Sequence, residues 1–314
     1  MDVVVLFPGQ GSQKPGMGKD LSEAHGAARA TFAAVDKALG EPLSELCFNG
    51  PGETLTLTQN AQPALLAHGM AVWTVVRDAL RPHVKAAAGH SLGEFTAHAA
   101  AGTFTLPDAA RIVRQRGALM QEAGFVRPGT MAAILGDLSE PIDVICARAS
   151  ADPEGGIVVP ANYNSPGQIV ISGEVSGVEK AMELCKAAGA KRALKLNVSG
   201  AFHSPLMAPA RDGLHESLAH ASMHRPGIPV YANVSTEPVC DPASARALLV
   251  EQLTAPVRWI ELVQRLAADY PEALYVEMGP GSVLVGLVKK IAPNVKTLTC
   301  GTVPEVERLL AAVA

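Results

Sequence analysis

The sequence predicts an α/β protein in which a smaller subdomain is inserted into a larger domain built on a parallel sheet. The unbroken apolar run Val3–Phe7, closed by Pro8-Gly9, is typical of a strand buried on both faces of such a sheet. Strand and helix patterns alternate near both ends of the chain. Between them the order changes to strand, helix, strand, strand, helix, strand, which is the ferredoxin-like βαββαβ unit. We therefore assign residues 1–127 and 199–314 to the large domain and 128–198 to the small one.

Composition narrows the functional class. The 314 residues, of which 48% are hydrophobic and 18% charged, can form one large domain or two smaller ones. A net charge of -4 and only 4% aromatic residues argue against nucleic-acid binding. No apolar stretch approaches the ~18 residues of a membrane span, and the N-terminus is unlike a secretory signal. We expect a soluble cytoplasmic protein.

The cysteines and histidines do not indicate a metal centre. The five cysteines are scattered without a Cys-x-x-Cys pair, so we expect buried free thiols and neither a disulfide framework nor a zinc site. His220 and His224 have the spacing of one helix face, but Arg225-Pro226 ends that helix at once. We therefore expect these two histidines to lie at the solvated surface and to bind no metal.

The first third of the chain leads to a conspicuous turn. After the first strand, the glycine-rich loop 9–13 lacks the Gly-Lys-Ser/Thr and the third glycine of nucleotide-binding loops, yet it lies where open α/β sheets bind ligands. Helical periodicity follows over 21–39 and 61–80. A short strand over 84–88 then meets a turn and a helix over 95–101, and a longer helix covers 105–124.

The remaining elements follow in order. In the small subdomain we predict strands over 130–135, 157–161, 168–172 and 192–198, with helices over 139–151, capped by Ser139, and 175–188. The asparagine-rich segment 162–167 would be a loop between two of these strands. Beyond it we predict helices over 205–221, 243–253, 259–270, 283–291 and 305–312, and strands over 229–233, 274–278 and 295–300.

The turn after the strand 84–88 is the candidate reactive centre. In Gly89-His90-Ser91-Leu92-Gly93 the glycines permit a cramped strand-to-helix reversal that exposes the serine hydroxyl at a helix N-terminus. The unpaired N–H groups there would stabilise an oxyanion. The alternative is an ordinary turn in which Ser91 caps the helix. The preceding strand and following helix favour a nucleophile.

A nucleophilic serine requires a base, and His203 is the best of the nine histidines. It lies in a non-periodic segment where the chain re-enters the large domain, and clefts between domains are common ligand sites. The alternative is a histidine that caps the helix begun by Pro205. No Asp or Glu stands out as a third member, so a backbone or amide carbonyl could orient the ring.

Arg116 lies in the middle of the apolar arc of the helix 105–124, between Ile112 and Met120. An unpaired buried charge costs several kcal/mol, so the guanidinium requires an anion or several carbonyl acceptors. The partner is either an internal carboxylate or the carboxylate of a substrate, gripped through two parallel hydrogen bonds. Position alone does not separate these two interpretations.

Seven motifs in order give the chain a family resemblance over essentially its whole length. Together they resemble the malonyl-CoA:acyl carrier protein transacylases and the related acyltransferase domains of polyketide synthases. The motifs are Pro8-Gly9-Gln10-Gly11-Ser12-Gln13, Ala61-Gln62-Pro63-Ala64, Gly89-His90-Ser91-Leu92-Gly93-Glu94, Gln115-Arg116-Gly117 with Met120-Gln121, Asn164-Ser165-Pro166-Gly167-Gln168, Ala201-Phe202-His203-Ser204 and Glu277-Met278-Gly279-Pro280-Gly281.

The resemblance implies an α/β-hydrolase-like large domain and a set of roles. Ser91 would form a malonyl ester, with His203 as general base and then acid, and Arg116 would hold the malonyl carboxylate. The backbone N–H groups of Gln10 and Leu92 would form the oxyanion hole. A carbonyl near Gln252 would orient the histidine. Malonyl-CoA and the phosphopantetheine thiol of acyl carrier protein would be the substrates, with no bound cofactor, and the family is commonly monomeric.

The resemblance also suggests how substrates are selected. Phe202 resembles the malonyl-selecting form of its motif, which disfavours a methyl branch by ~1 to 3 kcal/mol. Asn162 and Asn164 would face the cleft and contact substrate. Several basic residues could meet an acidic carrier protein, although solvated surface explains any one of them equally well: Lys191, Arg192, Lys195, Lys289 and Lys290.

Two other functions fit the same sequence features. A serine esterase or thioesterase on this fold would release a free acid to water, but it has no need of a buried cation beside its serine. A carrier-protein docking module without chemistry would form no covalent adduct. If the chain is a malonyltransferase, the sequence leaves open whether its acceptor serves fatty acid synthesis, a polyketide line or a malonate decarboxylase.

Overall fold

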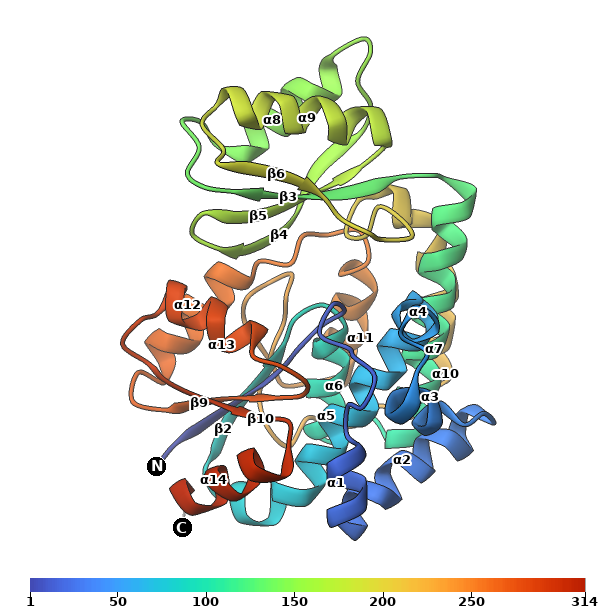
Figure 1. Ribbon diagram of the computed structural model, residues 1–314, viewed down its shortest axis with the longest axis vertical. Helices are drawn as coiled ribbons and strands as arrows, with labels where there is room; N and C mark the ends of the chain where they lie inside the picture. Colours follow the sequence, from blue (N-terminus) through green and yellow to red (C-terminus); the bar gives the residue numbers. More distant parts are fainter. Residues whose placement is uncertain (314) are drawn as a thin grey trace.

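The computed structural model describes residues 1–313, whose largest element is a six-stranded sheet (Figure 1). The strand order is β10-β9-β1-β2-β7-β8, and all neighbours are parallel except β7 and β8. The strands are β1 Val3–Phe7, β2 Val84–Gly89, β7 Val230–Tyr231, β8 Pro238–Val239, β9 Leu274–Met278 and β10 Lys296–Cys300. The parallel sheet predicted for the large domain is therefore present.

Strand β1 lies at the centre of this sheet and is buried on both faces, as its sequence predicts. Val3, Val5 and Phe7 pack into one hydrophobic core, whereas Val4 and Leu6 pack into the other. The first core includes α2 Gly26–Leu39, α5 Thr58–Leu80, α6 Leu92–Ala100 and α7 Leu106–Val126. The second includes α12 Trp259–Asp269 and α13 Val283–Ile291. Helices thus cover both faces of the sheet.

A second sheet is formed by the middle of the chain and lies at the top of Figure 1. Its four strands are antiparallel in the order β4-β5-β3-β6. They are β3 Thr130–Leu135, β4 Val158–Ser165, β5 Gln168–Gly173 and β6 Arg192–Lys195. Helices α8 Ile142–Ala151 and α9 Val175–Ala187 pack on the face turned away from the large sheet. The predicted order of strands and helices is observed here.

Several local predictions are wrong. The helix expected over 21–39 is two helices, α1 Lys19–Ala24 and α2, which are separated by extended backbone at His25. Ser139 does not cap α8, because this helix begins only at Ile142 and Pro141 is its N-cap residue. The segment 205–221 begins as a 3-10 helix, Pro205–Ala210, and becomes α-helical only after Pro209, which lacks an N–H. Cys240 is exposed, whereas the other cysteines are buried.

Besides α10 Arg211–His220, four further helices complete the described chain, and α3 and α4 have no counterpart in the predictions. These are α3 Leu43–Asn49, α4 Gly52–Thr56, α11 Pro242–Glu251 and α14 Val303–Val313. The helix α10 Arg211–His220 follows the 3-10 segment. None of the helices in residues 1–313 combines the length and apolar character that crossing a bilayer requires.

The close approach of β1 to the turn after β2 makes a stability prediction. A Cβ on Gly93 would lie 2.0 Å from the carbonyl oxygen of Phe7, a backbone atom that cannot rotate away. We expect Gly93→Ala to lower the free energy of unfolding by about 3 kcal/mol or more, measured by urea denaturation. The matched control is Gly286→Ala in α13, where a Cβ meets nothing within 4 Å. A small stabilisation is expected there, and equal effects of the two substitutions would contradict the argument.

Candidate active site

The turn between β2 and α6 places Ser91 at the carboxyl end of the parallel sheet. Ser91 has φ 51° and ψ −108°, a conformation that non-glycine residues rarely adopt. The flanking glycines allow it, because a Cβ on Gly89 would lie 1.9 Å from the carbonyl carbon of Gly93. Ser91 makes no side-chain cap on α6, so its hydroxyl is free for another role. The geometry is that of a serine held out on a strained turn.

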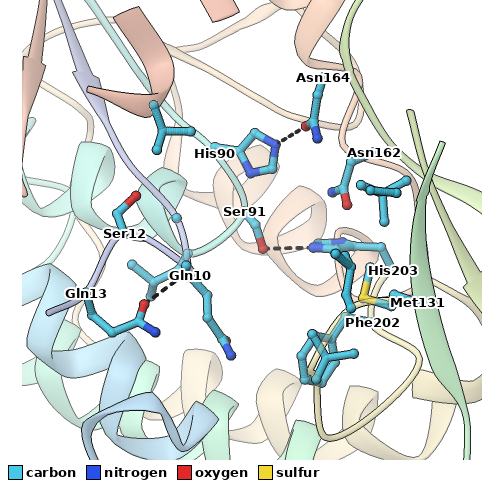
Figure 2. A pocket seen from close by; sticks show the side chains of 18 of the residues that line it. Gln10, Ser12, Gln13, His90, Ser91, Met131, Asn162, Asn164, Phe202 and His203 are labelled. Carbon is cyan, nitrogen blue, oxygen red and sulfur yellow. Dashed lines mark hydrogen bonds between the residues drawn. The ribbon is translucent and has the colours of Figure 1, made fainter. Parts of the chain in front are cut away.

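His203 contacts this serine. Its Nε2 lies 2.8 Å from Ser91 Oγ (Figure 2), and its Nδ1 lies 2.9 Å from the backbone carbonyl oxygen of Gln252. A carbonyl oxygen only accepts hydrogen bonds, so Nδ1 carries the proton and the lone pair of Nε2 faces the hydroxyl. His203 is buried and has a positive φ of 57°. The orienting acceptor is thus a carbonyl, and no carboxylate occupies that place.

The surroundings keep His203 neutral. Burial and, secondly, the charge of Arg116 lower the pKa of His203 to about 3. A neutral imidazole at physiological pH can accept the serine proton.

Arg116, on α7, lies on the other side of Ser91. Its Nη2 donates to Ser91 Oγ at 3.2 Å and to Gln252 Oε1 at 2.9 Å, and its Nη1 donates to Gln62 Oε1 at 2.7 Å. The guanidinium lies 5.1 Å from the ring centroid of Phe95. Within residues 1–313 Arg116 forms no salt bridge, and its buried Nε has no partner. The first interpretation from the sequence, an internal salt bridge, is therefore not observed there.

A cavity of about 430 Å³ opens above these three side chains. Ser91, His203 and Arg116 all line it, together with the loop that follows β1, strands β3 to β5 and the start of α13. Phe202 also lines it, next to Met131 in Figure 2. Leu92 and Gln10 border the cavity beside Ser91, and neither N–H donates a hydrogen bond within residues 1–313. Two residues that line the cavity with Ser91 therefore carry backbone N–H groups without a partner in the described chain.

The two predicted asparagines are placed differently from expectation. Asn162 and Asn164 lie on β4 and not in a loop, because β4 continues to Ser165 with two register shifts. Both still line the cavity. Asn164 Oδ1 lies 2.8 Å from His90 Nε2, so this amide is already engaged (Figure 2). Of these two asparagines, only Asn162 has a side chain that forms no hydrogen bond within the described residues.

Asn233, which sequence reasoning missed, holds the turn in place. Its Oδ1 accepts the N–H of Ser91 at 2.7 Å, and its Nδ2 donates to the carbonyl of Gly89 at 2.7 Å. Asn233 follows the short strand β7 and is fully buried. A polar residue just past a buried strand in a parallel sheet was the available signal, since such positions lie at the ligand-binding edge.

Comparisons with known proteins show which family the chain belongs to. Residues 4–309 match the acyl transferase domain family. The malonyl CoA-acyl carrier protein transacylase of Bacillus subtilis is 46% identical over 297 residues, covering 94% of this chain and 92% of that protein. The protein of the same name from Salmonella typhimurium is 44% identical over 307 residues, covering 98% and 97%.

Solved structures give the same result. The acyl-carrier-protein-S-malonyltransferase of Bartonella henselae is 45% identical with a TM-score of 0.94, covering 100% of this chain and 99% of that one. The PlMCAT:AntF structure, a type II PKS acyl-carrier protein in complex with its malonyl-transacylase, is 40% identical with a TM-score of 0.93, covering 99% and 100%. The site pairs a serine with a histidine beside a buried arginine, and the family match covers nearly the whole chain. This chain is therefore an acyltransferase that belongs to the acyl transferase domain family.

Proposed function

We propose that this enzyme transfers the malonyl group from malonyl-CoA to the phosphopantetheine thiol of acyl carrier protein, supplying extender units for fatty acid synthesis. The observation that carries the proposal is the Arg116 guanidinium. It is buried, lacks a carboxylate partner in residues 1–313, and lies 3.2 Å from Ser91 Oγ at the edge of the cavity. A malonyl carboxylate would supply the missing anion, whereas an acetyl group would not.

The two steps follow from the site. Ser91 Oγ attacks the thioester carbonyl as His203 Nε2 takes the hydroxyl proton. The N–H groups of Gln10 and Leu92 stabilise the tetrahedral oxyanion. The C–S bond then breaks, the protonated His203 gives its proton to the coenzyme A sulfur, and a malonyl-serine ester remains. In the second step the carrier's thiol gives its proton to His203 and its sulfur attacks the ester carbonyl. The C–O bond to Ser91 then breaks, and the protonated His203 returns the proton to Ser91 Oγ, which regenerates the free serine. The carbonyl of Gln252 keeps the imidazole in the required tautomer.

The finer assignments are part of the same proposal. The large domain, 1–127 and 199–314, is α/β-hydrolase-like, and residues 128–198 form a ferredoxin-like subdomain that covers the cavity. Phe202 limits branching at the α-carbon, and Asn162 contacts the acyl group. The carrier protein approaches past β6 and α13, since Leu196 and Val283 border the cavity and these elements carry Lys195, Lys289 and Lys290. The monomeric state and cytoplasmic location remain predictions.

One assay separates this function from its alternatives. The protein is incubated with malonyl-CoA in the presence and absence of holo acyl carrier protein, and free malonate, malonyl carrier protein and intact protein mass are followed. We expect a malonyl adduct on the native chain, none on Ser91→Ala, and transfer that far exceeds hydrolysis. Equal release of malonate with and without the carrier would indicate a thioesterase. The absence of any adduct would indicate a docking module without chemistry.

A further inference from the structure

Glu94 is a buried carboxyl group that the reaction steps above do not use. It lies on α6 one turn after Ser91, with 1% of its surface exposed. Its Oε2 accepts hydrogen bonds from Gln252 Nε2 at 2.6 Å and from the N–H of Asn233 at 3.0 Å. Both donors are neutral. Glu94 forms no salt bridge within residues 1–313, which is unusual for a carboxylate at this depth.

The side-chain amide of Gln252 connects Glu94 to Arg116. Gln252 Nε2 donates to Glu94 while its Oε1 accepts from Arg116 Nη2 at 2.9 Å. The same Nε2 also donates to the carbonyl of Ser91 at 3.1 Å. A negative and a positive group thus lie on opposite sides of one fully buried amide, immediately behind the nucleophile. The empty site is electrically neutral when Glu94 is ionised.

We propose that Glu94 takes up a proton when the carboxylate of the acyl donor binds to Arg116, so that Glu94 acts through Arg116 to set the affinity for acid-bearing donors. The proposal rests on the proposed function, because it requires an anionic acyl group in the cavity. Adding that anion beside an ionised Glu94 would leave two buried negative charges on one guanidinium. Protonation of Glu94 removes the excess charge and restores a neutral site.

The direction of the pH dependence follows from the free enzyme. Burial raises the pKa of Glu94 to about 7, against the opposing effects of Asn233, Gln252 and Arg116. A bound anion raises it further, because like charges disfavour ionisation. Proton uptake is therefore small below the pKa of the free enzyme, where Glu94 is already protonated. Above it, uptake approaches one proton, and the affinity for an acid-bearing donor falls as pH rises, by up to roughly tenfold per pH unit.

No other group around α6 is placed to take up this proton. The elements packed against α6 are β1, β2, α5, α7 and β7, and β1 has no ionisable side chain. Desolvation lowers the pKa of each histidine near the site, which disfavours its protonation, and it raises the pKa of Tyr231. The histidines are the buried His68, His98 and His203 and the half-buried His90. The remaining ionisable groups are exposed or half-exposed at the surface: Arg77, Asp78, Lys85, Asp108, Arg111, Arg114, Glu122 and Glu251.

The test is calorimetric titration of the full chain carrying Ser91→Ala, which cannot turn over. Titrations with malonyl-CoA and acetyl-CoA are made in buffers of different ionisation enthalpy, and the difference gives the number of protons bound. We expect about one proton per malonyl-CoA near pH 8, close to none near pH 6, and none with acetyl-CoA at either pH. Acetyl-CoA carries the same coenzyme, so any protons bound or released by the nucleotide phosphates are equal for the two donors. They cancel when the proton uptake with acetyl-CoA is subtracted from that with malonyl-CoA.

Glu94→Gln, added to the Ser91→Ala protein, tests whether Glu94 is the group that takes up the proton. Both hydrogen bonds of Glu94 fall on Oε2, so the amide oxygen of Gln can accept them while the charge is removed. We expect uptake to vanish and malonyl-CoA to bind up to tenfold more tightly near pH 8, with acetyl-CoA unchanged. If this variant does not fold, the neutral donor malonamyl-CoA replaces it as the control, and it should bind to the Ser91→Ala protein without proton uptake.

The outcomes separate the two proposals. Uptake that is equal for malonyl-CoA and acetyl-CoA, or unchanged by Glu94→Gln, overturns the role of Glu94 and leaves malonyl transfer intact. Failure of the native enzyme to form a malonyl adduct overturns the proposed function and the role of Glu94 with it.

Discussion

Replacing His203 with Ala is expected to lower the rate of acyl-enzyme formation by roughly three to four orders of magnitude. Ser91 Oγ would lose the Nε2 acceptor that lies 2.8 Å away, and within residues 1–313 no other acceptor is hydrogen-bonded to this hydroxyl. Arg116 also contacts the hydroxyl but only as a donor. Single-turnover kinetics with malonyl-CoA, read by intact mass, measure the change directly.

The matched control for His203→Ala is His220→Ala, at the exposed end of α10. It should leave both the rate and the melting temperature unchanged. A rate for His203→Ala within tenfold of the native enzyme, in protein that melts normally, would show that another group activates the serine.

The neutral state of His203 also predicts a pH dependence of stability. Its pKa is about 3 in the folded protein, against about 6.5 for an unfolded histidine. Below pH ~6.5 the unfolded chain therefore binds a proton that the folded one excludes. The stability that His203 contributes is fully present above pH ~6.5 and is lost as pH falls towards 3. Urea denaturation between these values should show a shallower loss of stability for His203→Gln than for the native chain.

The parallel sheet could be predicted because β1 is an apolar run and β9 is apolar except for Glu277, and a proline or glycine directly follows each strand. Both were predicted to the residue. Helices α3 and α4 were missed since they span only seven and five residues, too few to show a repeating helical pattern. Strand β7 is only two residues long, because the chain turns away at Asn233 to contact the Ser91 loop. The local sequence pattern does not predict where a strand or helix ends when a tertiary contact sets that end.

Residues of the site could be predicted only where their neighbours in the sequence indicate their role. The glycines on either side of Ser91 indicate a strained turn, and Arg116 is a charged residue on an otherwise apolar helix face. Two other buried polar groups have partners that lie far away along the chain. Asn233 is 142 residues from the serine it holds. His68 is buried, and its Nε2 contacts the carbonyl oxygen of Gly301, 233 residues away. Such partners become visible only once the fold is known.

Replacing Arg116 with Ala should remove the preference for acid-bearing donors. We expect kcat/KM for malonyl-CoA to fall about 10²- to 10⁴-fold, which corresponds to about 3 to 5 kcal/mol for a buried charge pair that loses one partner. Acetyl-CoA should lose much less, because it never engages the guanidinium. Methylmalonyl-CoA should fall in parallel with malonyl-CoA, since it carries the same carboxylate and differs only at the carbon that Phe202 limits. Steady-state kinetics with the three donors give the ratios.

Two further substitutions on α7 test whether the guanidinium fork itself is required. Arg116→Lys keeps the charge but cannot contact Gln62, Gln252 and a carboxylate together, so its malonyl-to-acetyl ratio should lie between those of the native enzyme and Arg116→Ala. Arg114→Ala, two residues away, removes a cation that pairs with Glu41 at the surface and should leave the ratio unchanged. If Arg116→Ala lowered the rates with malonyl-CoA and acetyl-CoA by the same factor, the arginine would support Ser91 or Gln252 structurally and would not bind the donor's carboxylate.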